Sequence, residues 1–131
     1  MSEHGFRSLI VWQKAKALAV EVYRLTRGEA IKHDFSLIDQ LRRSAVSVPG
    51  NIAEGDERKS DKDSVRFFHI AKSSLAELAT QLEIAQEAGY FTTAQVEPLI
   101  GQFAGLGKML GALIRARTNP APKAPRHMPS L

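Results

Sequence analysis

A repeat of apolar residues at alternating spacings of three and four constrains this chain more than any other feature of its sequence. The repeat is clearest in Phe68, Ala71, Leu75, Leu78, Leu82 and Ala85. Because an α-helix has about 3.6 residues per turn, this spacing places these side chains on one helix face. Ser60 before the repeat is a suitable N-cap, and Gly89 after it is a suitable end. The segment is therefore predicted to form one long amphipathic helix.

Three further segments have the same periodicity. One covers residues 8–27, one begins with Ser36 as N-cap and Asp39 three residues later, and one follows Thr92 or Thr93. Their apolar stripes consist of Val11, Ala15, Leu18, Val22 and Leu25; of Leu37, Leu41, Ser44, Val48, Asn51 and Gly55; and of Val96, Leu99, Phe103, Leu106, Leu110 and Leu113. Each stripe predicts a helix with one face in the core.

Helices joined by loops this short pack as antiparallel sequential neighbours. The predicted fold is therefore all-α, an antiparallel up-down-up-down four-helix bundle. We expect the bundle to cover residues 1–117 and a Pro-rich basic tail to cover residues 118–131.

The second helical segment contains the stretch that bundle patterning does not explain, residues 40–55. Pro49 removes one backbone hydrogen bond and clashes with the preceding turn, so we predict a kink or break near residues 45–49. Asn51 and Glu54 lie near the core side, where polar groups need partners. One interpretation is a structural polar network of Gln40, Asn51 and Glu54, in which Asn51 bonds carbonyls freed by Pro49 and Glu54 pairs with an arginine from a neighbouring helix. The other is a ligand or RNA contact.

Charge is distributed unevenly along the chain. Residues 1–97 contain 13 Lys and Arg against 14 Asp and Glu, whereas residues 98–131 contain five Lys and Arg and no acidic residue. A basic end of this kind serves as a solubilising tail or as a contact for an anionic partner such as RNA.

The candidate nucleic-acid-binding residues are the cations around the unusual stretch and on the first helix. They are Lys14, Lys16, Arg42, Arg43, Arg58 and Lys59. Lys and Arg contact phosphate oxygens, and such contacts make affinity fall with salt. The alternative is that the arginines serve folding and subunit contacts.

Glycines crowd the fourth helical segment at positions 101, 105, 107 and 111, mostly off its apolar stripe. Each costs about 1 kcal/mol relative to alanine in a helix interior. Either this helix is weak, or the glycine face packs closely against another subunit.

Nothing in the sequence predicts catalysis, a cofactor or a metal site. There is no cysteine, the four histidines are scattered, and no Glu-x-x-His pair occurs. His69 and Ser73 lie one turn apart but lack the exposed elbow and oxyanion donors of a nucleophilic site. Gly105 and Gly107 precede Lys108, but Met109 stands where a phosphate-binding loop requires Ser or Thr. We therefore expect no enzyme, and, without a signal peptide or a long apolar run, a cytoplasmic protein.

Several motifs together resemble one protein family. They are Val11-Trp12-Gln13-Lys14-Ala15, the whole stretch from Gln40 to Gly55 with its Asn-Ile-Ala-Glu-Gly sequence after a proline, Arg66-Phe67-Phe68-His69-Ile70-Ala71, and Ser74-Leu75-Ala76-Glu77-Leu78. They resemble the bacterial four-helix-bundle proteins associated with intervening sequences in large-subunit ribosomal RNA genes, over about residues 6–115. The accessory variability protein of diversity-generating retroelements is a more distant relative.

The resemblance implies a four-helix bundle that assembles as a ring-like homo-oligomer, typically a pentamer. In the retroelement relatives the basic surface of the oligomer binds reverse transcriptase and nucleic acid. The glycine-rich fourth helix, the Pro-rich tail and the near-neutral charge of residues 1–97 depart from the family pattern. The first hypothesis is thus a non-enzymatic homo-oligomer that binds RNA or a nucleic-acid-processing protein; the alternative is an oligomeric protein–protein interaction scaffold.

Overall fold

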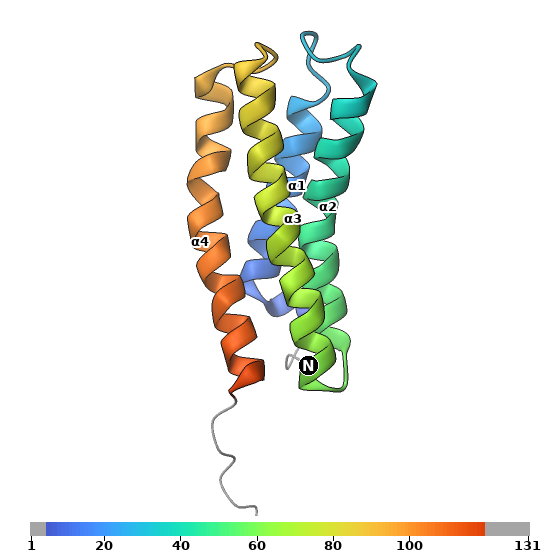
Figure 1. Cartoon of the computed structure of the whole chain (residues 1–131), viewed down its shortest axis with the longest axis vertical. Coiled ribbons are helices and arrows are strands. Elements are labelled where there is room, and N and C mark those ends of the chain that lie inside the picture. The colour runs from blue at the N-terminus through green and yellow to red at the C-terminus, as the bar shows by residue number, and fades with distance from the viewer. Residues whose placement is uncertain (1–4, 120–131) are drawn as a thin grey trace, which may run out of the picture.

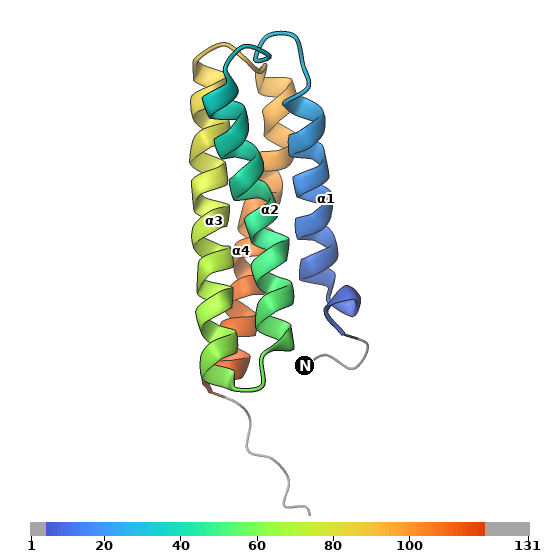
Figure 2. The ribbon, with the colours of Figure 1, turned by 90° about the vertical axis from the view of Figure 1, so that its right-hand side faces the viewer.

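The structure, a computed structural model that describes residues 5–119, is a bundle of four long helices without strands in that range (Figures 1 and 2). A short 3₁₀ helix, η1 (Phe6–Ser8), precedes α1 (Ile10–Leu25), α2 (Phe35–Glu57), α3 (Asp61–Glu87) and α4 (Thr93–Thr118). In Figure 1 the chain ascends along α1 and α3 and descends along α2 and α4. The predicted all-α four-helix class is confirmed. The predicted tail falls, after Asn119, outside the described residues.

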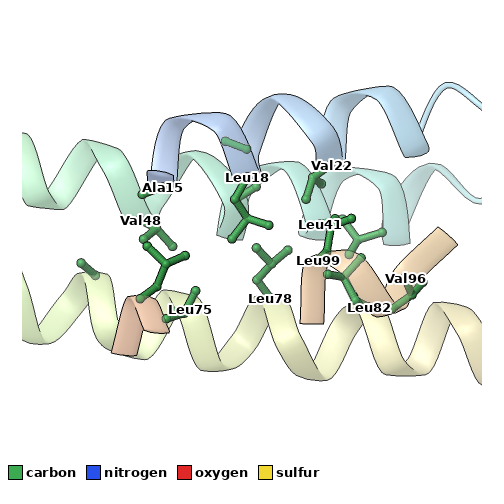
Figure 3. Packing of buried hydrophobic residues seen from close by; sticks show 14 of the residues in the cluster. Ala15, Leu18, Val22, Leu41, Val48, Leu75, Leu78, Leu82, Val96 and Leu99 are labelled. Atoms are coloured by element: carbon green, nitrogen blue, oxygen red, sulfur yellow. The ribbon is translucent and has the colours of Figure 1, made fainter. Parts of the chain in front are cut away.

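The four predicted stripes meet in one core (Figure 3). Its most buried members include Leu18, Val22, Leu41, Val48, Ile52, Phe68, Leu78, Leu82, Leu106 and Leu110. Burying one such side chain contributes roughly 1.5–3 kcal/mol, so the stripes supply the main driving force for folding. The loops add Ile31 and Phe91, which close the end of the core where α1 ends and α4 begins.

Side chains cap three of the long helices at their N-termini. Ser60 accepts from the Asp63 amide at 3.1 Å, as predicted, and Thr92 forms a reciprocal capping box with Gln95. The prediction for α2 is wrong, because Asp34 and not Ser36 is its N-cap and accepts from the Leu37 amide at 3.1 Å. The two residues differ by less than one turn, and an aspartate oxygen caps as well as a serine oxygen.

Pro49 does not break α2, which runs without interruption from Phe35 to Glu57. A change of its axis at Pro49 stays a prediction. Near its end α2 crosses α3 closely at Gly55. A Cβ built there would lie 2.5 Å from the Phe68 ring and 3.1 Å from the Ser64 carbonyl oxygen, so only glycine fits.

Candidate nucleic-acid interface

Arg42 is held inside the α1–α2 contact. It is half-buried, its Nε donates to Thr26 Oγ1 at 2.8 Å, and its guanidinium lies 4.7 Å from the centre of the Tyr23 ring. Thr26 Oγ1 in turn donates to the Val22 carbonyl at 2.8 Å. Arg42 therefore ties the end of α1 to α2, and cation–π contact contributes to that tie.

Arg43, the next residue, points to solvent. Its Nε lies 2.9 Å from Asp39 Oδ2, and the two side chains are 80% and 62% exposed. An exposed ion pair of this kind contributes about 0–1 kcal/mol, so an anionic ligand could replace Asp39 at small cost.

Lys14 and Lys16 lie on different sides of α1. Lys14 lines a groove of about 280 Å³ against α4, next to Gly101 and Gly105. Lys16 lies in a second groove, against α2, with its Nζ 5.0 Å from the centre of the Trp12 ring. The two lysines therefore cannot contact the same short stretch of a ligand.

Arg58 and Lys59 lie at the other end of α2, at its joint with α3. Arg58 Nη2 is 2.8 Å from Glu54 Oε2. The Phe67 ring contacts two guanidiniums, those of Arg58 and Arg66, each 4.4 Å from its centre. Lys59 is exposed and forms no ion pair within residues 5–119. Sequence reasoning missed Arg66 and Phe67 as partners of Arg58, although both stand in a motif that carries the resemblance.

Five of the six predicted cations thus form two groups and not one patch. Lys16, Arg42 and Arg43 belong to the α1–α2 side, and Arg58 and Lys59 to the α2–α3 joint, 15 residues further along α2 from Arg43. At about 1.5 Å per residue that separation is about 22 Å. Lys14 belongs to neither group, because it faces α4.

The three residues of the predicted polar network, Gln40, Asn51 and Glu54, do not bond one another in residues 5–119. Asn51 Nδ2 donates to the Ser47 carbonyl at 2.8 Å and to Ser47 Oγ at 3.0 Å, and Ser47 Oγ lies 2.7 Å from Ser74 Oγ of α3. The carbonyl that loses its helical partner to Pro49 belongs to Ala45, so Asn51 does not bond it. Glu54 is exposed and pairs with Arg58 of its own helix. Gln40 is exposed.

The most buried charged group was missed by sequence reasoning. Asp56 is 1% exposed, and Arg117 near the end of α4 lies 3.6 Å from it and 3.6 Å from Asp61. Arg117 Nη1 also donates to Ser64 Oγ at 2.9 Å, and Ser64 Oγ donates to the Gly55 carbonyl at 2.7 Å. Asp56 stands four residues after the buried Ile52, on the same helix face. That spacing could have predicted that Asp56 is buried.

Gly55, Asp56, Ser64 and Arg117 form a cluster where α2 meets α3. This cluster gives a physical reason for Gly55, the last residue of the Gln40 to Gly55 motif. The glycine permits the helix crossing, its carbonyl accepts the serine hydroxyl, and the aspartate faces an arginine from α4. Within the motif Gly55 permits this contact, and the neighbouring Asp56 and Ser64 meet Arg117 of α4 at one end of the bundle.

The described residues hold no group of three or more His, Cys, Asp or Glu that could bind a metal ion. None of the helices in residues 5–119 is both long and apolar enough to cross a membrane.

Comparison with known proteins matches the chain to a family. The family model described as 23S rRNA-intervening sequence protein matches residues 7–112. A crystal structure of a protein of unknown function from the S23 ribosomal protein family of Bacteroides thetaiotaomicron is similar, with 24% identity and a TM-score of 0.72. The match covers 81% of this chain and 99% of that one and concerns the fold alone. No curated protein matches the chain.

Proposed function

The chain belongs to the 23S rRNA-intervening sequence protein family, and we propose that it is a non-enzymatic, homo-oligomeric bundle that binds RNA or an RNA-containing nucleoprotein in the cytoplasm. One observation carries the proposal. At the α2–α3 joint two arginines contact one aromatic ring, beside the exposed Lys59. Guanidinium planes and aromatic rings stack on unpaired bases, and lysines contact the phosphates between them.

The ion pair between Arg58 and Glu54 does not oppose this role. Both side chains are substantially exposed, at 40% and 57%, so the pair contributes about 0–1 kcal/mol and can give way to phosphate. In this proposal Lys14, Lys16, Arg42 and Arg43 add phosphate contacts along α1 and α2, and the basic tail adds more.

The test is light scattering after size exclusion at low and high salt, with and without total cellular RNA. We expect an oligomer that elutes with RNA at low salt and releases it at high salt, because released counterions make affinity salt-dependent. The joint variant Arg58→Ala with Lys59→Ala and Arg66→Ala should lose most of this RNA. Lys32→Ala, at the other end of the bundle, is the control. An oligomer that ignores RNA at low salt would contradict the proposal.

The second candidate is an oligomeric scaffold for another protein, favoured by the inward contacts of Arg42. It predicts that Arg42→Ala with Arg43→Ala changes assembly or stability more than RNA affinity. Comparing the mass and melting temperature of this variant with its RNA retention separates the two candidates.

A further inference from the structure

The α1–α2 side carries an apolar groove of about 450 Å³ that the bundle leaves open. Val20, Tyr23 and Val46 line it and are 41%, 40% and 46% exposed. Figure 2 shows α1 and α2 side by side along this surface. Apolar side chains gathered in a groove favour contact with another apolar surface.

The rim of this groove is basic. Lys16, Arg24 and Arg27 line it, and of these Arg24 pairs with Glu21. Residues 5–53, which include both helices of the groove, contain eight Lys and Arg against four Asp and Glu. An occupant with carboxylates beside apolar side chains fits this surface.

The same chain presents such a surface on α3. Exposed residues follow one another at spacings of three and four along its outer side. They are Ile70, Ser73, Glu77, Thr80, Ile84 and Glu87. Ile84 is 52% and Ile70 38% exposed, although both are apolar. The outer side of α3 therefore presents two exposed apolar side chains among polar and acidic ones.

The second half of the outer face of α3 is also acidic. Residues 73–87 contain Glu77, Glu83 and Glu87 and no Lys or Arg, whereas Arg66 and Lys72 belong to the first half of the helix. The carboxylates from Glu77 to Glu87 extend over about 15 Å of helix, and the cations from Lys16 to Arg27 over about 16 Å, at about 1.5 Å per residue. The two surfaces therefore match in charge, in length and in apolar content.

We propose that a second copy of this chain lays the outer face of its α3 in the α1–α2 groove. Ile84 would pack on Tyr23, Val20 and Val46, while Glu77 and Glu87 face Lys16 and Arg27. The inference rests on the homo-oligomer of the proposed function and names its contact. Because α3 lies across the bundle from α1 (Figure 2), one chain can use both surfaces at once.

Such a contact joins two different surfaces, so it is heterologous and generates a ring if the rotation closes. It also assigns Lys16 to the subunit contact and not to phosphate. The α2–α3 joint stays outside the contact and free for RNA.

Charge reversal on each surface tests the contact. The groove variant is Lys16→Glu with Arg27→Glu, and the face variant is Glu77→Lys with Glu87→Lys; all four positions are exposed, so the fold should survive. Light scattering should give each variant alone the mass of the single 14.4 kDa chain. Mixed in equal amounts, the two should associate to a mass above that of a single chain, because each reversed surface then meets its complement.

The control for the groove variant reverses two exposed lysines elsewhere, Lys32→Glu with Lys108→Glu, and should keep the wild-type mass. Circular dichroism checks that every variant is helical.

If both variants keep the wild-type oligomer, this contact is wrong while the homo-oligomer stands. If the groove variant keeps its mass and loses RNA, the groove is an RNA site and the contact is again wrong. A monomeric wild type would contradict both the homo-oligomer and the proposed contact. Whether the same samples retain RNA then tests the RNA binding of the proposed function separately.

Discussion

Gly55 and Gly50 lie on the same helix but in opposite environments. A Cβ at position 55 would lie 2.5 Å from the Phe68 ring, whereas a Cβ at position 50 meets nothing within 4 Å. We expect Gly55→Ala to destabilise the fold by about 1–3 kcal/mol, because the α2–α3 crossing must open. Gly50→Ala should stabilise it by up to about 1 kcal/mol through helix propensity. Denaturant midpoints measure both, and equal midpoints would contradict the close crossing.

Tyr90 gives the fold a titratable contact between two loops. Its hydroxyl donates to Asp34 Oδ2 at 2.8 Å, and this hydrogen bond raises the pKa of Tyr90 above 10.0, with burial and the Asp34 charge acting in the same direction. Because the folded pKa is the higher one, the contact contributes below pH 10 and is lost as the pH rises through the folded value.

The titration of Tyr90 can be read directly in a Tyr23→Phe background, which leaves one tyrosine. The near-ultraviolet absorbance of the Tyr90 phenolate should rise at a higher pH in the folded chain than in the unfolded chain. Adding Asp34→Asn should lower the pKa of Tyr90, since the charged acceptor is gone. An unchanged titration after Asp34→Asn would show that the hydrogen bond does not hold the pKa up.

At the scale of the helix, Arg117 holds the C-terminal end of α4 against the other helices. Its guanidinium reaches Asp56, Asp61 and Ser64, which belong to α2 and α3. Arg117→Met keeps much of the stem but removes the charge, so we expect a loss of about 1–3 kcal/mol. Hydrogen exchange should rise first in the last turns of α4. The exposed Arg115→Met is the matched control and should stay within about 0.5 kcal/mol.

Helix positions could be read from the sequence because their cause is local. Spacings of three and four near Leu78 or Leu110 place apolar side chains on one face whatever the partner helix is. N-caps follow the same logic, and the error at Ser36 arose because Asp34, two residues earlier, offers an equivalent acceptor. Of the kink or break predicted at Pro49, the break does not occur, because the packing of a long helix offsets one missing hydrogen bond.

Side-chain partners between helices could not be read in the same way. Arg117 and Asp56 are 61 positions apart, and their contact exists only after α4 has packed beside α3. Arg42 and Arg43 are adjacent and chemically identical, yet one bonds Thr26 and the other faces solvent. The sequence identified the cations of the candidate site, but only the fold separates them into two groups.

At the scale of the whole molecule, charge and shape divide the chain into regions with different tasks. The α1–α2 side is basic around an apolar groove, the second half of the outer face of α3 is acidic, and the α2–α3 joint combines arginine with an aromatic ring. A protein that bound nucleic acid over its whole surface would not need an acidic face. Segregated charge of this kind instead favours ordered self-association, with the main RNA contacts at the joint.

The last prediction concerns the contribution of the tail to RNA affinity and not to the fold. Residues 120–131 add Lys123 and Arg126 to a chain whose acidic residues all precede position 98. If both cations contact phosphate, a chain that ends at Asn119 should bind single-stranded RNA with a salt slope shallower by about 1.4, at about 0.7 per neutralised phosphate. The oligomeric mass should not change, because the proposed contact uses only α1, α2 and α3. Titrations of a labelled oligonucleotide at several salt concentrations measure the slope, and an unchanged slope would show that Lys123 and Arg126 do not contact phosphate.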